Sequence, residues 1–200
     1  MSSKATYHHG DLRAALIRAA LELLEESGET ALSLRAVARR AGVSPAAPYR
    51  HYPDREALVS AVAAVGYREL AERLAAAHPS PSTPDQLATV AIAYVQFALD
   101  RPALFRIMFA EPCDHHNDER VAATEAVSHY VRQIATRTFP QADAEALAIA
   151  IWALVHGLAF LHLDNKLDAT APSAVADRVT AAIQALLTAT GAETGSAAAG

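Results

Sequence analysis

Apolar residues recur at three- and four-residue steps along most of the chain, and no stretch shows the two-residue alternation typical of a strand. Within Asp11–Ser27, for example, Leu12, Leu16, Ala19 and Leu23 fall on one face of a helix. The composition agrees, because 52% of the residues are apolar and only 8 of 200 are glycine. The sequence therefore predicts an all-α fold.

Glycine, proline and capping residues set the limits of the predicted helices. Ser33 and Ser44 are expected N-caps, Gly42 is an expected helix stop, and Pro45 is an expected first helical residue. The segment "HPSPSTP" contains three prolines and marks a break at residues 78–84. The predicted helices are Asp11–Ser27, a short helix after Ser33, Pro45–His51, Asp54–Ala77, Asp85–Asp100, Pro102–Ala110, Arg120–Phe139, Ala142–Leu167 and Ser173–Thr188.

Composition also argues against several classes of protein. The single cysteine, Cys113, excludes an intrachain disulfide and a cysteine-based zinc cluster. Uninterrupted apolar runs stay well below about 18 residues, so we expect no membrane segment. The N-terminal "MSSKATYHHGDLR" lacks the apolar core of a signal peptide. The expected location is therefore the cytoplasm.

The net charge of -5 conceals a local basic segment. Residues 1–55 contain eight Lys and Arg residues against six acidic residues, whereas the rest of the chain is acidic. Between Ser33 and Arg55, five arginines face the single acid Asp54. A basic patch on an otherwise acidic protein suits a polyanionic partner that is bound in one orientation.

The stretch "LRAVARRAGVSPAAPYRHYPDREAL", residues 34–58, has the spacing of a helix-turn-helix. Ala38 is small enough to let two helices cross closely, Gly42 makes the turn, and Val43 fills the gap between the helices. A longer amphipathic helix follows from Asp54. The helix-turn-helix spacing therefore coincides with the basic segment that suits a polyanionic partner.

This stretch resembles the helix-turn-helix of the tetracycline-repressor (TetR) family, and the resemblance covers about residues 11 to 60. The segment "AALIRAALELLEESG" resembles the first helix of that family, and "WALVHG" at Trp152–Gly157 is similar to the Trp-His-Gly motif of one C-terminal subclass. The matching residues of the motif are Ala38, Ala41–Ser44, Tyr49, His51–Tyr52 and Asp54–Leu58.

The resemblance implies a ligand-responsive transcriptional regulator, with repression as the expected sign. Residues 1–53 would form a three-helix DNA-binding domain, and residues 54–77 a connecting helix. Residues 78–189 would form a helical bundle that holds a small-molecule effector and dimerises through its last two helices. Residues 190–200 are an expected disordered tail. The homodimer would bind a palindromic operator and release it when the effector binds.

A recognition helix over Pro45–His51 would enter the major groove. Its alanines can contact thymine methyl groups, and Arg50 can bind guanine through two hydrogen bonds. The family resemblance implies that Tyr49 and His51 hold phosphates. The complete predicted DNA-binding set is Arg35, Ser44, Pro45, Ala46, Ala47, Tyr49, Arg50, His51 and Arg55.

Pro48 stands where the family usually has a bulky aliphatic residue. It removes the hydrogen bond that its N–H would give to Ser44, and it disfavours α geometry at Ala47. We therefore expect a tight or 3₁₀-like first turn in the recognition helix.

Trp152, His156 and Phe160 are four residues apart, so they share one face of a helix that lines either a ligand cavity or a packing interface. A buried His156 needs a polar partner and is a candidate ligand anchor. The expected opposite walls are Tyr94, Phe97, Phe105 and Met108. Such a pocket predicts an apolar or aromatic effector, and no cofactor is expected.

Three other functions compete with this interpretation. An enzyme is not expected, because no phosphate-binding loop, nucleophile elbow or zinc-protease helix is present. A metal-responsive regulator would use the loop Glu111–Glu119, whose donors match no closed zinc site. A protein-interaction module without DNA binding would not explain five arginines against one acid.

Overall fold

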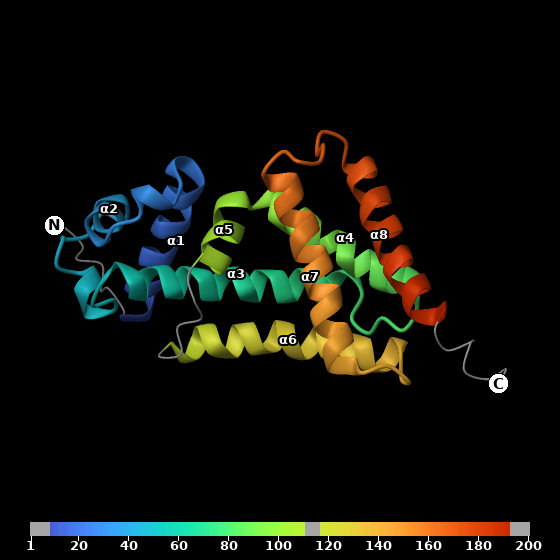
Figure 1. Ribbon diagram of the computed structural model, residues 1–200. Helices are drawn as coiled ribbons and strands as arrows, with labels where there is room; N and C mark the ends of the chain where they lie inside the picture. Colours follow the sequence, from blue (N-terminus) through green and yellow to red (C-terminus); the bar gives the residue numbers. More distant parts are fainter. Residues whose placement is uncertain (1–8, 111–116, 193–200) are drawn as a thin grey trace. The chain divides into compact units, whose positions relative to one another are not determined.

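The computed structural model describes residues 9–110 and 117–192, and within them every regular element is helical (Figure 1). This confirms the predicted all-α fold. The helices are α1 (His9–Ser27), η1 (Glu29–Ala31), α2 (Leu34–Arg40), η2 (Pro48–Arg50), α3 (Arg55–Ala77), α4 (Pro84–Asp100), α5 (Pro102–Ala110), α6 (Asp118–Thr138), α7 (Ala144–Leu163) and α8 (Pro172–Ala192), where η marks a 3₁₀-helix.

The chain forms two compact units. The first unit comprises Met1–Tyr67 and Ala103–Thr124, and the second comprises Arg68–Pro102 and Glu125–Gly200. Both α3 and α6 contribute one part of their length to each unit. The connecting helix predicted at residues 54–77 is therefore part of both units.

The first unit is built on α1, which packs against α2 and η1. The side chains that fill its centre come from α1, α2, α3 and α5 and from the turn between α1 and α2. Those at most 1% exposed include Leu16, Leu24, Leu32, Val37 and Leu58. The three- and four-residue spacing seen in the sequence therefore corresponds to the buried faces of these helices.

Of the two predicted N-caps, Ser33 caps α2 but Ser44 caps no helix, because the turn after it replaces the first turn of the predicted helix and no side chain caps η2. The Ser33 side chain accepts a hydrogen bond from the backbone N–H of Ala36, and Asp54 accepts one from Ala57. Each interaction satisfies a donor that the first helical turn leaves without a partner. Because these interactions span only three residues, the sequence alone was sufficient to locate both helix starts.

In the second unit, α7 and α8 both pack against α4 (Figure 1). Three residues of α8 that are spaced four apart, Val175, Val179 and Ile183, are fully buried. The apolar residues of α4 are buried on several sides, including Val95 and Ala98. The helix α4 is therefore the centre of this unit.

The helix α7 ends earlier than the predicted limit at Leu167. Asn165 has a φ angle of 55°, in the left-handed region. The N–H of Lys166 donates to the carbonyl of Leu161, and that of Asn165 donates to His162. This pair of bonds is the Schellman ending, and asparagine tolerates the required φ better than most residues. The ending stops the helix at Leu163.

The helix α7 is long and apolar enough to cross a membrane when judged by length and composition only, with a mean hydropathy of 2.0. The expectation of no membrane segment rests on uninterrupted apolar runs, and His156, Gly157 and His162 interrupt this run without adding charge. A core helix of a water-soluble protein passes the same test, and a third of this segment is buried. The result is therefore weak support for membrane association.

Candidate functional site

The turn after α2 has the geometry predicted for a helix-turn-helix. Gly42 has a φ angle of 69°, and its N–H donates to the carbonyl of Arg39. The N–H of Val43 donates to the carbonyl of Ala38 over 3.0 Å. These two bonds form a Schellman ending, in which glycine takes the left-handed position without strain. The sharp reversal directs the chain into the recognition segment.

The recognition segment, residues 44–51, differs from the predicted helix Pro45–His51. Its first part is a turn closed by a bond from the Ala47 N–H to the Ser44 carbonyl, and only Pro48–Arg50 is helical, as a 3₁₀-helix. No side chain caps η2. Pro48 has no N–H to give to Ser44, so an α-helix cannot propagate through this point. The expected 3₁₀-like turn is present, but Ala47 keeps α geometry, contrary to expectation.

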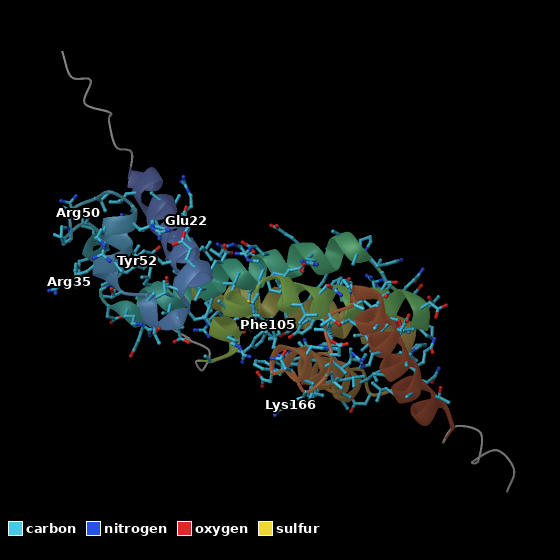
Figure 2. The ribbon with its side chains drawn as sticks, turned by 90° about the horizontal axis from the view of Figure 1, so that it is seen from above. Glu22, Arg35, Arg50, Tyr52, Phe105 and Lys166 are labelled. Atoms are coloured by element: carbon cyan, nitrogen blue, oxygen red, sulfur yellow. The ribbon has the colours of Figure 1, made fainter. Side chains whose placement is uncertain are left out.

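The recognition segment and α2 present polar and basic side chains to solvent. Tyr49 is 53% exposed, and Arg35, Ser44, Pro45, Ala46 and Arg50 are also exposed. Figure 2 shows Arg35 and Arg50 pointing outward from the first unit, whereas Tyr52 points inward. Ala47 and His51 are half-buried. Most of the predicted DNA-binding residues are therefore accessible to a partner.

Arg40 is held by α1 and differs in this respect from Arg35 and Arg50. Its guanidinium pairs with Glu26 and, over 3.4 Å, with Glu22. The hydrogen bond from Arg40 lowers the pKa of Glu26. Among the described residues, Arg35 and Arg50 form no such ion pair. The carboxylates of α1 thus form ion pairs with Arg40, whereas the outward-facing Arg35 and Arg50 have no carboxylate partner among the described residues.

Arg55 connects α3 to the turn between α1 and α2. Its Nε donates to the carbonyl of Leu32 over 3.0 Å, and its Nη2 donates to the carbonyl and the carboxylate of Glu29 over 3.2 and 3.1 Å. Three acceptors within the fold therefore fix this guanidinium. Arg55 was predicted to contact a DNA phosphate, and to do so it would have to give up or share these hydrogen bonds.

His51 and Tyr52 lie side by side at the base of the recognition segment, with ring centroids 6.4 Å apart. The Nε2 atom of His51 is buried and has no hydrogen-bond partner among the described residues. Tyr52 is 3% exposed and therefore belongs to the core of the first unit. Burial raises the pKa of its phenol. The two rings therefore pack next to each other where the recognition segment joins the core of the first unit.

Part of the predicted effector set comes together in the second unit. The Oη atom of Tyr94 lies 3.0 Å from Nδ1 of His156, and the indole N–H of Trp152 donates to the same Oη over 3.3 Å. The Phe160 ring lies 4.9 Å from that of His156. The stripe on α7 is therefore present and meets α4 at Tyr94.

The chemistry of these groups sets the direction of one of the two hydrogen bonds. An indole N–H can only donate, so Tyr94 accepts from Trp152. The direction between Tyr94 and Nδ1 of His156 depends on which ring nitrogen carries the hydrogen. Burial lowers the pKa of His156, which favours the neutral ring. His156 therefore has the polar partner that its burial requires.

The other predicted effector residues lie elsewhere. Phe97 is buried within α4. Phe105 and Met108 are fully buried in the first unit, where Phe105 contacts Phe109 and the carbonyl of Met108 accepts from the hydroxyl of Tyr67. The structure therefore brings Tyr94 together with the α7 stripe and does not join Phe105 and Met108 to that cluster.

Two cavities of the second unit bear on the effector site. The smaller, of about 30 Å³, is lined by apolar side chains together with Tyr94 and Trp152. The larger, of about 580 Å³, lies between the α6–α7 turn and the end of α8, and its lining includes Phe139, Leu147 and Leu186. Sequence reasoning missed this cleft, because it depends on where α8 lies relative to the α6–α7 turn.

Most of the possible metal donors, Glu111, Cys113, Asp114, His115 and His116, lie outside the described residues. Of the two that are described, Glu119 pairs with Arg13 of α1 over 2.8 Å. Within residues 9–110 and 117–192, no cluster of three or more histidine, cysteine or acidic side chains could hold a metal ion. Arg13 was not among the predicted functional residues, and its partner is 106 residues away.

Comparison with known proteins gives matches in both parts of the chain. Residues 16–62 match the sequence profile of bacterial regulatory proteins of the tetR family, and residues 87–187 match that of the tetracyclin repressor-like C-terminal domain. The first match contains the helix-turn-helix, and the second contains α7 with its stripe. The more specific similarity of Trp152–Gly157 to a Trp-His-Gly subclass stays a prediction.

Solved structures with the same fold cover nearly the whole chain. A protein of unknown function from Rhodococcus sp. RHA1 is 33% identical, with a TM-score of 0.76 over 90% of this chain and 97% of that one. A regulatory protein in the tetR family from Rhodococcus RHA1 is 24% identical, with a TM-score of 0.65 over 92% and 97%. A TetR-like transcriptional regulator from Rhodococcus sp. RHA1 is 17% identical, with a TM-score of 0.64 over 91% and 98%.

The last two structures show the fold, whereas the C-terminal profile covers half of the chain and the N-terminal profile covers the DNA-binding motif. The N-terminal match spans the Gly42 turn and the exposed arginines beside it, whose geometry is that of a helix-turn-helix. They also exclude an enzymatic role, as the sequence predicted. The chain therefore belongs to the TetR family of DNA-binding transcriptional regulators.

Proposed function

We propose that this TetR-family member is a cytoplasmic, ligand-responsive repressor that binds a palindromic operator as a homodimer. Residues 1–53 bind DNA, residues 54–77 connect, and residues 78–189 dimerise and bind the effector. The observation that carries the proposal is the exposed recognition segment with its outward-facing arginines, Arg35 and Arg50. A basic surface on a helix-turn-helix matches the charge and the groove geometry of duplex DNA.

Within the recognition segment, we assign sequence reading to Arg50 and to the small residues before it. The exposed Pro45 and Ala46 allow close approach of the backbone to the base edges. Arg35 and Tyr49 supply contacts to the DNA backbone, which fix orientation and carry no sequence information. His51 is assigned a similar role, which requires its ring to turn outward, because Nε2 is buried and has no hydrogen-bond partner among the described residues.

An exposed apolar face on α7 supports dimerisation. Ile149 is 60% exposed and Leu161 is 43% exposed, with the small residues Ala153 and Gly157 exposed between them. Monomers seldom leave such a face uncovered. Two copies of α7 and α8 related by a two-fold axis would cover it as a four-helix bundle and pair two recognition segments.

The apolar lining of the second unit supports an apolar or aromatic effector. Effector binding changes the population of the DNA-binding form only if the two forms of the protein bind the effector with different affinity. We assign release of the operator to the effector-bound form.

The experiment that tests this function is selection of binding sites from random duplex DNA with the purified chain at physiological salt. The expected product is a palindrome whose half-sites lie about one helical turn, ~34–36 Å, apart. A selected sequence without symmetry would contradict the homodimer. A folded protein that selects no sequence, with binding that hardly depends on salt, would contradict operator recognition.

A further inference from the structure

The smaller cavity of the second unit is enclosed by side chains of α3, α4, α6 and α7, among them Leu74, Leu87, Val131 and Ile151. Its volume of about 30 Å³ is enough for a water-sized guest only. Small-molecule sites in proteins measure roughly 300–1,000 Å³. An effector can therefore enter this core only if one of the lining side chains moves.

Trp152 is the lining residue that can move at the lowest cost. It is 42% exposed, whereas its neighbours in the wall, Tyr94 and Ile151, are each 4% exposed. Every other lining residue is buried or half-buried. The indole thus separates the cavity from solvent, and rotating it outward disturbs less packing than moving any other part of the wall.

The indole is held closed by a weak polar contact. Its N–H donates to Oη of Tyr94 over 3.3 Å, which is longer than a typical hydrogen bond of this kind. Tyr94 in turn contacts Nδ1 of His156 over 3.0 Å. When Trp152 turns away, Oη of Tyr94 loses a donor, and a guest with a hydroxyl group can supply one in its place.

We infer that Trp152 is the gate of the effector site, and that the site takes a small, uncharged, ring-containing molecule with one hydroxyl group that replaces the indole N–H on Tyr94. A charged guest is excluded because no charged side chain lines the cavity. The inference rests on the proposed effector binding and deepens it by naming the path and the class of ligand.

The single tryptophan of the chain makes the gate directly observable. The full-length protein, without DNA, is titrated with cyclohexanol while tryptophan emission is recorded, and cyclohexanecarboxylate serves as the charged comparison. Cyclohexanol is expected to change the Trp152 emission in a saturable manner. The carboxylate is expected to bind at least about tenfold more weakly, since about 1.4 kcal/mol corresponds to that factor.

Two matched variants localise the effect. Ala91→Val adds two methyl groups to the cavity wall and is expected to weaken cyclohexanol binding about tenfold or more. Arg132→Ala changes an exposed residue of α6 outside the wall and is expected to leave binding unchanged. Circular dichroism and thermal unfolding confirm that both variants fold.

The inference is overturned by equal binding of cyclohexanol to wild type and Ala91→Val, by equal binding of alcohol and carboxylate, or by an emission change that follows protein concentration instead of cyclohexanol. Operator binding is measured separately, without cyclohexanol. If the wild type binds its operator while cyclohexanol leaves Trp152 emission unchanged, the gate is wrong and the DNA-binding function stands. If cyclohexanol binds as expected but the chain selects no operator, the gate stands and the proposed function fails.

Discussion

Arg40 and Arg50 carry the same charge in the same short segment, yet the fold uses them differently. Arg40 pairs with Glu22 and Glu26 of α1, whereas Arg50 points away from the first unit. A guanidinium already paired with carboxylates has less to gain from a phosphate or a base. The surrounding structure, and not the residue type, decides which arginine is available to DNA.

Arg50→Ala is expected to weaken specific operator binding by about 1–3 kcal/mol and to relax the preference at one base step per half-site. Arg35→Ala is expected to weaken all sequences alike and to reduce the salt dependence of binding. Titrations of operator and scrambled duplex at several salt concentrations measure both effects, with Arg40→Ala as the control. Equal loss of specificity in the Arg50 and Arg35 variants would refute the division of roles.

Arg55→Ala is expected to reduce the free energy of unfolding by about 1–2 kcal/mol, because three acceptors on Leu32 and Glu29 lose their donor. Chemical denaturation measures the change, and the exposed Arg35→Ala should stay within about 0.5 kcal/mol of wild type. If Arg55→Ala unfolds like wild type but loses DNA affinity, its main partner is a phosphate.

At the scale of elements, Pro48 limits the length of one helix of the first unit, and Gly66 permits the close packing of two others. Pro48 limits the recognition segment to a turn and a 3₁₀-helix. Gly66 lies where α3 meets α5, and a Cβ atom placed there would come within 2.5 Å of Sδ and 2.8 Å of Cγ of Met108. Met108 is itself fully buried and has little room to withdraw. The close contact with Met108 therefore explains why α3 has glycine at position 66, although glycine has a lower helix propensity than alanine.

Gly66→Ala is expected to destabilise the protein by about 1–3 kcal/mol from overpacking, partly offset by the roughly 1 kcal/mol that alanine gains in a helix. In a Met108→Ala background the same change should cost less or stabilise. Denaturation of the two single variants and the double variant gives the coupling. Simple stabilisation by Gly66→Ala alone would mean that the crossing tolerates a side chain.

At the scale of the whole molecule, the buried His162 and the half-buried His156 link stability to pH. His162 is 2% exposed and lies 3.3 Å from a guanidinium nitrogen of Arg178, which also donates to the carbonyl of Asp168. Burial, followed by the charge of Arg178, lowers the pKa of His162. Burial also lowers the pKa of His156. Both rings are therefore harder to protonate in the folded chain than in the unfolded one.

The free energy of unfolding is expected to fall as the pH decreases below about 6.5, the ordinary histidine pKa. In this range the unfolded chain takes up protons that the folded chain binds only at lower pH. His162→Gln and His156→Gln should each flatten the decrease. Denaturant unfolding between pH 8 and pH 5, values chosen to bracket about 6.5, measures it. A pH dependence identical to wild type in both variants would assign the decrease to other groups.

The limits of the helices were predictable where short-range interactions set them. Ser33 and Gly42 act on backbone groups three to five residues away, so their roles follow from the printed order of residues. The 3₁₀ geometry near Pro48 followed for the same reason. The end of α7 did not, because the left-handed conformation of Asn165 is one of several that asparagine can adopt.

By itself, the sequence determined the helical class, most helix starts and the helix-turn-helix, because periodicity, caps and turns are local properties of the chain. Only the tertiary structure decided that Glu26 holds Arg40, that Arg55 spans to Leu32, and that Trp152 is half-exposed above Tyr94. It also placed Phe105 and Met108 in the first unit. These features depend on contacts between residues far apart in the chain, and such contacts exist only once the helices have packed.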